Sequence, residues 1–532
     1  MIASIVRDGN WPDLGIEWTR LLPVVVVLAG AVLATLVEAI ARDSSWRKTA
    51  QVIWALVVVA MAGLIAGDKA VNAPAELAAR GTYLADQFTS FMQLAIAVAA
   101  FLALLVMADR SVQGEDAFSP QVASIPGSAY EEQARKANLV LTDVYPLALF
   151  SIGGMMLFPA AGDLITLFVA LEVMSLPLYL LAGMARRRRL LSQEAAFKYY
   201  VMGALSSGIF LFGAAWLYGA TGQLRLVELF EAVRQDPLTN RALLLTGLTL
   251  LLIGLLFKVG AAPFHSWTPD VYQGAPSPVT GFMAACTKVA AFGALIRILY
   301  GLQVVQLDLK AMLWTVSIVT MVVGTVVGVV QKDVKRLLAY SAIAHAGFIL
   351  AGVVSFSHQG MQASMFYLFT YAVSTVGAFG VITLVREVDS QGHVRSEATG
   401  LDQWRGLGRR SPVLAGAFSV FLLAFAGIPF TAGFVGKFAV FAAAFGAGAW
   451  VLGVVGLACS AAAAFFYARV IVAMFFSGEP GDVVTGGVGC GVRTTGLTQL
   501  AIALSLAFTL VVGVVPGWLL NFAASMAKLL TG

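Results

Sequence analysis

Charged residues are scarce in this chain. Lysine, arginine, aspartate and glutamate make up 12% of the 532 residues, whereas hydrophobic residues make up 59%, and the mean hydropathy is +0.86. A soluble domain is about one quarter charged, so this composition excludes an ordinary soluble fold. It predicts an α-helical protein that crosses a membrane many times.

Patterns for metal, nucleotide or redox chemistry are also lacking. The three cysteines, Cys286, Cys459 and Cys490, do not have the spacing of metal ligands. No glycine pattern of the Rossmann or P-loop type occurs. We therefore expect no cofactor and no metal ion on this chain, and no redox catalysis by the chain itself.

Long apolar runs dominate instead. Windows of about 20 residues, the length of a membrane-spanning helix, predict fourteen spans. Two of them, 241–272 and 411–446, are too long for one simple crossing, and each contains a proline near its middle. An all-α polytopic membrane protein with broken seventh and twelfth helices is therefore expected. The predicted spans lie near residues 21–41, 50–67, 86–108, 144–160, 163–184, 194–219, 241–272, 277–300, 311–330, 335–356, 360–385, 411–446, 449–475 and 497–521.

Basic residues are distributed unevenly between the two sides of these spans. Connections that follow odd-numbered spans carry roughly twice as many lysines and arginines as the other side, a bias typical of inner loops. This predicts that both termini lie on the outer side, which is the periplasmic side if the membrane is a bacterial cell (inner) membrane. The run Arg186–Arg189 lies directly at a helix end, which favours an anchor at the inner membrane surface over nucleic-acid binding.

Two halves of the central region resemble each other. LEVMSLPLYLLAG (171–183) aligns with YSAIAHAGFILAG (340–352), and the break at Pro263 corresponds to the break at Pro429. Each half holds five spans, so the two repeats are inverted in the membrane, an arrangement typical of transport sites at the midplane. We predict an N-terminal three-helix segment with its loop (1–137), two inverted repeats (138–305 and 306–476), and a Gly-rich loop with the last helix (477–532).

Four charged residues lie deep within the predicted spans: Glu172, Lys258, Lys288 and Lys437. Holding a charge at mid-membrane costs roughly 2.5–3.5 kcal/mol, so such a residue indicates function. Burial favours the neutral form of a lysine and a nearby carboxylate favours the charged form, so a Glu–Lys pair of variable separation can load and release a proton. A static buried salt bridge would explain one pair, Glu172 with Lys258, but leaves two lysines without an intramembrane acid.

Other polar residues of the spans are weaker candidates for a relay. His345 lies within a span and has a side chain suited to proton transfer, although a lone helix histidine is as often structural. His265 follows the Pro263 break, and Lys198 lies near the inner end of its span, where snorkelling to the surface is the simpler role. The breaks at Pro263 and Pro429 are either ordinary kinks or sites where freed carbonyls support a hydrated pocket.

At these residues the chain resembles a known family, the antiporter-like membrane subunits of respiratory complex I, which are related to the Mrp cation/proton antiporters. The resemblance implies that Glu172 is the glutamate of the fifth helix, Lys258 its partner lysine, Lys288 the middle lysine and Lys437 the lysine of the broken twelfth helix. Within the family, WTPDVYQGAPSPV is most similar to the N-type. The resemblance is carried by FKVGAAPFHSWTPDVYQGAPSPVTGFMAACTKVAAF, LEVMSLPLYLLAG, DVKRLLAYSAIAHAGFILAG and GIPFTAGFVGKF.

The resemblance implies a proton-translocating subunit of an NADH:quinone oxidoreductase, with one proton channel and no redox centre. FMN, iron–sulfur clusters and quinone are then expected in other subunits, and the partners are neighbouring membrane subunits and the lipid bilayer. A stand-alone Mrp-type cation/proton antiporter subunit is the main alternative. Na⁺ would need several oxygen ligands at mid-membrane, and Glu172 is the one carboxylate that we expect there.

Overall fold

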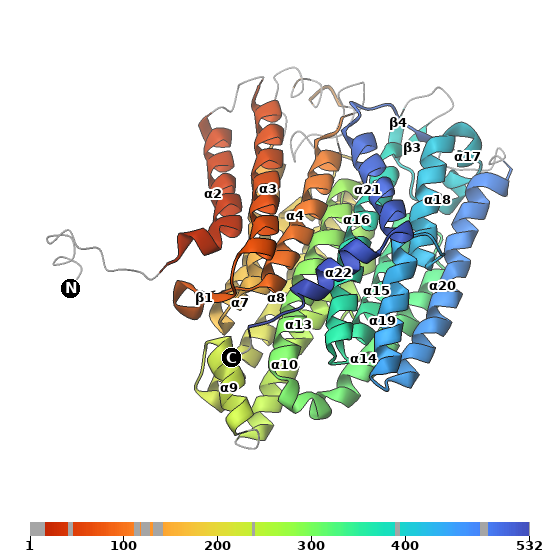
Figure 1. Ribbon diagram of the computed structural model, residues 1–532. Coiled ribbons are helices and arrows are strands. Elements are labelled where there is room, and N and C mark those ends of the chain that lie inside the picture. Colours follow the sequence, from red (N-terminus) through yellow and green to blue (C-terminus); the bar gives the residue numbers. More distant parts are fainter. Residues whose placement is uncertain are drawn as a thin grey trace.

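Long helices run side by side through the molecule, and their connections lie at two opposite ends (Figure 1). The computed structural model describes residues 16–40, 46–110, 117–118, 128–130, 133, 142–236, 240–388, 394–478 and 488–530. The odd-numbered spans end at the side drawn uppermost in Figure 1. We refer to that end as the inner end and to the opposite one as the outer end.

Fourteen crossings are confirmed within the described residues. Twelve helices are long and apolar enough to span a membrane, and the shorter apolar helices α6, α18 and α19 supply the other two crossings. The unbroken spans are α2 (Trp18–Ile40), α3 (Arg47–Asn72), α4 (Gln87–Ala108), α6 (Val144–Leu157) with η2 (Phe158–Ala160), α7 (Leu164–Ala182), α8 (Arg189–Thr221), α14 (Gln306–Val329), α15 (Val334–Val353), α16 (His358–Leu384), α20 (Trp450–Phe476) and α21 (Leu497–Val514).

The seventh and twelfth spans are broken, as predicted. Span seven consists of α10 (Arg241–Val259) and α11 (Trp267–Gly274), and span twelve consists of α18 (Pro412–Ala426) and α19 (Ala432–Gly446). The first half of each ends at a glycine with positive φ, Gly260 at 74° and Gly427 at 82°, a conformation that glycine adopts without steric cost. The two broken helices run in opposite directions (Figure 1), as inverted repeats require.

The eighth span contains a second irregularity. It begins as α12 (Ser277–Phe282), continues through a π-helical turn, η3 (Met283–Thr287), and resumes as α13 (Lys288–Gly301). Such π turns are rare and occur frequently at functional sites. The turn ends directly before Lys288.

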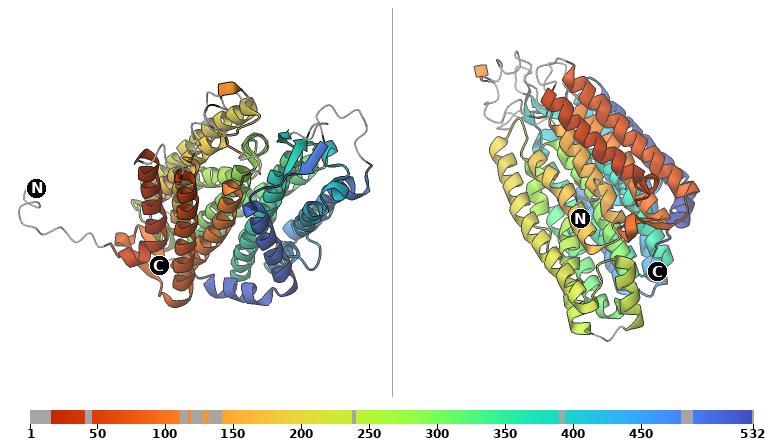
Figure 2. Two further views of the ribbon diagram at one scale, coloured as in Figure 1. Left: turned by 90° about the horizontal axis from the view of Figure 1, so that it is seen from above. Right: turned by 90° about the vertical axis from the view of Figure 1, so that its left-hand side faces the viewer.

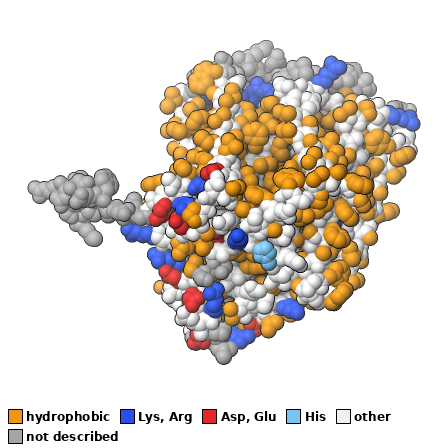
Figure 3. Space-filling view, in the orientation of Figure 1, with side chains coloured by type: hydrophobic (Ala, Val, Ile, Leu, Met, Phe, Trp, Pro, Cys, Tyr) orange, Lys and Arg blue, Asp and Glu red, His pale blue; other side chains and the backbone are white. Residues whose placement is uncertain are grey.

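Hydrophobic side chains cover the centre and right of the face drawn in Figure 3, whereas charged side chains gather at the top and on the lower left. Exposed leucine, valine and phenylalanine side chains occur along α2, α3, α8 and α20. Because lipid tails are as apolar as these side chains, this surface fits a membrane environment. The chain is a multi-pass membrane protein.

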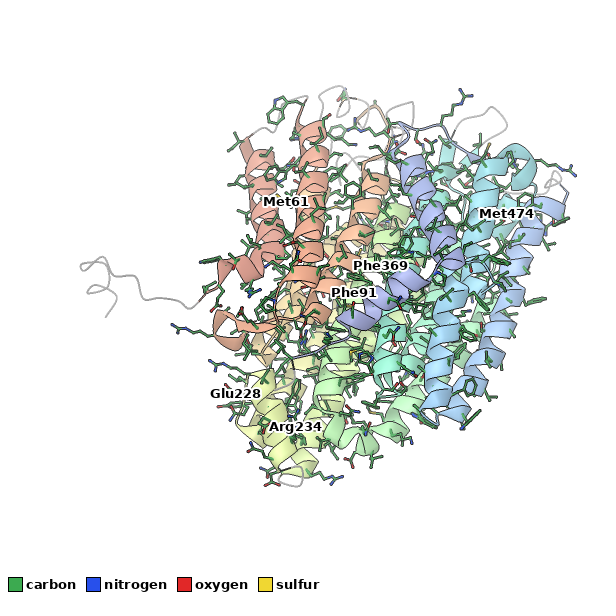
Figure 4. All side chains as sticks on the ribbon, in the orientation of Figure 1. Met61, Phe91, Glu228, Arg234, Phe369 and Met474 are labelled. Atoms are coloured by element: carbon green, nitrogen blue, oxygen red, sulfur yellow. The ribbon has the colours of Figure 1, made fainter. Side chains whose placement is uncertain are left out.

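The N-terminal helices pack along one flank. In the right-hand view of Figure 2, α2 and α3 lie side by side on the outside of the bundle. The third helix, α4, is enclosed by α6, α12, α13, α16 and α21, and its Phe91 meets Phe369 of α16 edge to face with ring centroids 6.0 Å apart (Figure 4). The first three helices therefore contact both central halves through α4.

Several short helices and strands connect the spans at the outer end. The segment 224–236 contains α9 (Leu226–Gln235), whose buried residues are all apolar: Leu226, Leu229, Phe230 and Val233. Glu228 and Arg234 of α9 point away from the bundle (Figure 4). The last predicted span ends early: α21 stops at Val514, and α22 (Gly517–Met526) follows Pro516 as a separate helix that lies across the bundle (Figure 1). The remaining outer elements are β1 (Glu76–Ala78), η1 (Ala79–Gly81), β2 (Tyr83–Ala85) and η4 (Gln303–Val305).

A small sheet closes the inner end. Strands β3 (Val385–Val388), β4 (Val394–Glu397) and β5 (Val488–Gly491) are antiparallel in the order β4-β3-β5, and they lie beside one another in the view from above (Figure 2). Helices η5 (Leu401–Trp404) and α17 (Leu407–Arg410) follow β4. Strand β5 comes from the Gly-rich segment that sequence reasoning left as a loop.

The carboxylate of Glu397 fastens this sheet to the bundle. It accepts hydrogen bonds from Lys335 Nζ at 3.1 Å and from the backbone N–H of Ser277 at 3.1 Å, and Arg386 lies 3.5 Å away. Burial raises the pKa of Glu397, but the charges of Lys335 and Arg386 and the hydrogen bonds lower it further, to about 2. Glu397 is therefore ionised at physiological pH and holds β4 against the starts of α12 and α15.

Glu397→Ala is expected to loosen this attachment. The buried ammonium of Lys335 loses its carboxylate, a change of about 1–3 kcal/mol for a charged hydrogen bond, and trypsin should then cleave faster at Arg386. Because the folded pKa of Glu397 is depressed, its contribution is complete above the ordinary carboxyl pKa and is lost as the pH falls toward about 2. Cleavage at pH 8 that is as slow in Glu397→Ala as in the unchanged protein and in Glu397→Gln would contradict this role.

Candidate functional site

Lys258 lies in the last turn of α10, directly before the break. Its side chain is 3% exposed. The Nζ atom lies 5.2 Å from the ring centre of Tyr179 and 5.3 Å from that of Tyr199, and it donates a long hydrogen bond of 3.4 Å to Tyr179 Oη. The carbonyl end of a helix is negative and favours a cation, and aromatic ring faces do so as well.

Glu172 lies on α7 near this group without touching it. Its carboxylate interacts electrostatically with Lys258, but no hydrogen bond joins the two residues, and Glu172 Oε1 is buried without any partner among the described residues. The two residues of the predicted pair therefore lie near each other, but their side chains are not hydrogen-bonded. An unpaired buried carboxylate oxygen is costly, so Oε1 is available to a cationic partner.

Lys288 reaches the same break from the eighth span. Its Nζ donates hydrogen bonds to the carbonyl of Val259 at 3.0 Å and to the carbonyl of Ala342 at 2.6 Å. Val259 is the last residue of α10, so its carbonyl has no partner within the helix. Lys288 therefore caps the first half of the broken helix and links it to α15.

Lys437 does the same at the second break. Its Nζ donates to the carbonyl of Ala426, the last residue of α18, at 3.2 Å and to Ser460 Oγ of α20 at 2.7 Å. It also lies 4.8 Å from the ring centre of Phe348 on α15. At both breaks a lysine ammonium therefore binds the last carbonyl of the first half-helix. Lys288 comes from the neighbouring span, whereas Lys437 belongs to the second half of its own broken helix.

His345 lies on α15 between the two lysines. Its Nδ1 is 2.6 Å from Tyr367 Oη, and its Nε2 is 3.2 Å from Tyr467 Oη, which also bonds Ser341. The imidazole is 1% exposed and interacts electrostatically with both Lys288 and Lys437. Ser341, Tyr467, His345 and Tyr367 therefore form a chain of hydrogen bonds. This chain lies near both lysine sites without a hydrogen bond to Lys288 or Lys437.

The remaining predicted residues lie further out. His265 is half-buried in the break after α10, and its Nδ1 has no partner among the described residues. Lys198 forms ion pairs with Glu194 at 2.6 Å and Asp270 at 2.8 Å in a partly exposed groove near the inner end. Pro263 and Pro429 are exposed on the flank of the bundle, whereas the freed carbonyls face inward to the lysines.

Sequence reasoning missed the aromatic and hydroxyl partners of the lysines. Tyr179 follows Glu172 by seven residues, a spacing that places both on one helix face, and that signal was available. Tyr199, Tyr467 and Ser460 come from other helices, and nothing in their local sequence distinguishes them from ordinary packing residues.

Groups suited to a metal ion are absent from the described parts of the chain, where no cluster of three or more His, Cys, Asp or Glu occurs. The chemistry that the described site supports is proton transfer between lysines, imidazole and phenols. Each of these groups can donate or accept a proton in at least one of its states.

The chain is similar to proteins of known type over nearly its whole length. Residues 161–462 match the family described as "NADH:quinone oxidoreductase/Mrp antiporter, TM". A relative from Beutenbergia cavernae named NADH-quinone oxidoreductase subunit N is 53% identical over 98% of this chain and 99% of its own length. One of the same name from Mycobacterium tuberculosis is 48% identical, again over 98% and 99% of the two chains.

Solved structures agree with these matches. A chain of respiratory complex I from Thermus thermophilus is 31% identical, with a TM-score of 0.74 over 94% of this chain and 99% of that one. A chain of the Mrp complex from a Dietzia species is 22% identical, with a TM-score of 0.79 over 96% and 97% of the two chains, a likeness of fold. This chain belongs to the NADH:quinone oxidoreductase/Mrp antiporter transmembrane family.

Proposed function

We propose that this chain is the N-type proton-translocating membrane subunit of an NADH:quinone oxidoreductase. The observation that carries the proposal is the pair of lysine-capped helix breaks, Lys288 on Val259 and Lys437 on Ala426. His345 is close enough to interact electrostatically with both lysines. Buried amines that can exchange protons, set at broken helices, are what a proton channel requires. Redox cofactors then belong to partner subunits of the complex.

The proposed path runs from the inner side of the membrane to the outer side and passes these groups in order. Protons enter from the inner side near Lys258, pass to Lys288, cross the His345 network to Lys437, and leave on the outer side. Glu172 biases the charge state of Lys258, and redox energy released in neighbouring subunits acts on this pair. The repeats 138–305 and 306–476 supply one half of the path each, and both termini lie on the periplasmic side.

A cation/proton antiporter subunit is the second candidate, favoured by the fold shared with the Mrp chain. Na⁺ binding needs several oxygen ligands. At the Lys288, Lys437 and His345 sites the oxygens are backbone carbonyls, a hydroxyl and a phenol, already engaged by ammonium groups or imidazole. The Lys258 site adds one carboxylate, that of Glu172. The observed ligands therefore favour proton transfer over Na⁺ transport.

Purification of the intact complex through a tag on this chain separates the two candidates. We expect co-isolation with flavin-containing and iron–sulfur subunits and NADH-driven, Na⁺-independent acidification of inverted vesicles. Isolation with antiporter subunits alone, or transport that requires Na⁺, would overturn the proposal.

Lys437→Met is expected to stop the release of protons to the outer side. The substitution keeps the volume but removes the ammonium from Ala426 and Ser460, so this site can no longer hold a proton. NADH-driven pumping per electron should fall, with normal NADH oxidation by the peripheral subunits measured with an artificial acceptor. Lys528→Met, near the C-terminus, is the matched control, and equal pumping by the two variants would exclude this role for Lys437.

A further inference from the structure

The ammonium of Lys258 lies in an aromatic cage formed by Tyr179 of α7 and Tyr199 of α8. The two rings meet edge to face with centroids 4.7 Å apart, and Nζ lies within 5.3 Å of both centres. Both tyrosines are buried. Ring centres within about 6 Å of a cation attract it, most strongly where water is excluded.

Neighbouring residues hold the two rings of the cage in place. Trp267 of α11 stacks on Tyr199 with centroids 4.7 Å apart and planes at 7°, and its Nε1–H donates to the carbonyl of Phe257 at 3.0 Å. The other wall depends on Gly203, where a Cβ would lie 2.1 Å from Tyr179 Oη. The two halves of the broken helix and α8 therefore fix the positions of both rings.

We propose that Tyr179 and Tyr199 are positioning residues that form a resting site for the charged side chain of Lys258, apart from Glu172. The proposal rests on the proton-translocating function proposed above. The cage holds the cation through ring faces and one long hydrogen bond, without a fixed negative charge. Lys258 thus has two alternative partners, the cage and the carboxylate of Glu172, which has a free oxygen in this structure.

The groups that face Lys258 come from four elements. Glu172 and Tyr179 belong to α7, Tyr199 belongs to α8, and Lys288 of α13 binds the carbonyl of the next residue, Val259. Trp267 of α11 carries no titratable group. Among the described residues that touch Nζ, the cage therefore supplies the contacts that favour the protonated lysine, and its removal should make Lys258 lose its proton at lower pH.

The test is the pH profile of NADH-driven proton pumping by the intact complex in vesicles. In Tyr179→Leu and Tyr199→Leu, we expect the alkaline limb of the profile to move by about one pH unit toward acid, a tenfold change in the balance of the two forms. Tyr179→Phe and Tyr199→Phe keep the ring faces and should show less than half of that shift. A merely structural role would change the amount of assembled complex but not the position of the limb.

Tyr218→Leu is the matched control, because Tyr218 lies on the same helix as Tyr199 with 49% of its surface exposed. The cage proposal would be refuted if the alkaline limb of the pH profile stayed in place in both leucine variants, or if it moved toward alkaline pH. Lys258→Met, measured in the same assay, separates the two proposals. Normal pumping by Lys258→Met would refute the channel itself, whereas lost pumping together with unmoved tyrosine variants would refute the cage alone.

Discussion

Lys258→Ala is expected to reduce proton pumping by about 100-fold or more, the lower end of what a positioned proton-transfer group contributes. The ammonium of Lys258 is the group between the inner half-helix α11 and the Lys288 site, and alanine offers no group that can take its place. Pumping should be measured in inverted vesicles against the amount of assembled complex. Glu172→Ala removes the carboxylate that influences the charge of Lys258 but leaves Lys258 itself to carry the proton. Glu172→Ala should therefore lower pumping less than Lys258→Ala does.

A lysine at the outer end provides the control for this experiment. Lys310 is exposed and lies 4.9 Å from the ring centre of Trp314, outside the proposed path. Lys310→Ala should leave pumping unchanged. Normal pumping in both Lys258→Ala and Glu172→Ala, with the complex assembled, would defeat the proposed channel.

Arg297→Ala is expected to cause the largest loss of stability, about 3–5 kcal/mol, because it breaks a buried ion pair from one side. Arg297 and Asp86 are both 0% exposed, with NH1–Oδ2 and NH2–Oδ1 distances of 2.9 Å. The guanidinium also donates to Pro159 O at 2.7 Å and to Thr89 Oγ1 at 2.8 Å. This pair ties α13 to the start of α4 and to the end of span four.

Thermal unfolding of the purified complex, followed by loss of this chain from the assembly, measures the effect. Arg241→Ala is the control, because Arg241 pairs with Asp308 at the surface, where the two side chains are 43% and 24% exposed, and such pairs contribute about 0–1 kcal/mol. The double variant Asp86→Leu/Arg297→Met should be less damaging than Arg297→Ala, since no charge is left unpaired. Equal midpoints for Arg297→Ala and Arg241→Ala would contradict the assignment.

The crossings and the broken helices could be predicted from the sequence because both follow from local rules. Apolar runs of span length and a mid-span proline need no knowledge of neighbours, and the lysines were evident from their apolar surroundings. Arg297 shows where that reasoning stops. Its partner Asp86 lies 211 positions away along the chain, and no local pattern reports such a contact.

The same limit applies to the site. Lys288 was expected as a central relay, yet its attachment to the end of α10 and to α15 depends on how three helices meet. Strand β5 lay hidden in a Gly-rich segment because pairing with β3, not its own residues, makes it a strand. Tertiary pairing of this kind outweighs the low strand preference of glycine.

Main-chain oxygens at Val259, Ala342 and Ala426 hold the ammonium groups of Lys288 and Lys437. A carbonyl is the same whichever side chain its residue carries, so substitutions at these three positions leave the ligands intact as long as the helices keep their course. Selection on the two sites should therefore concentrate on the lysines and on the residues that break the helices. The ligand positions themselves are expected to drift among small and branched apolar residues without loss of transport.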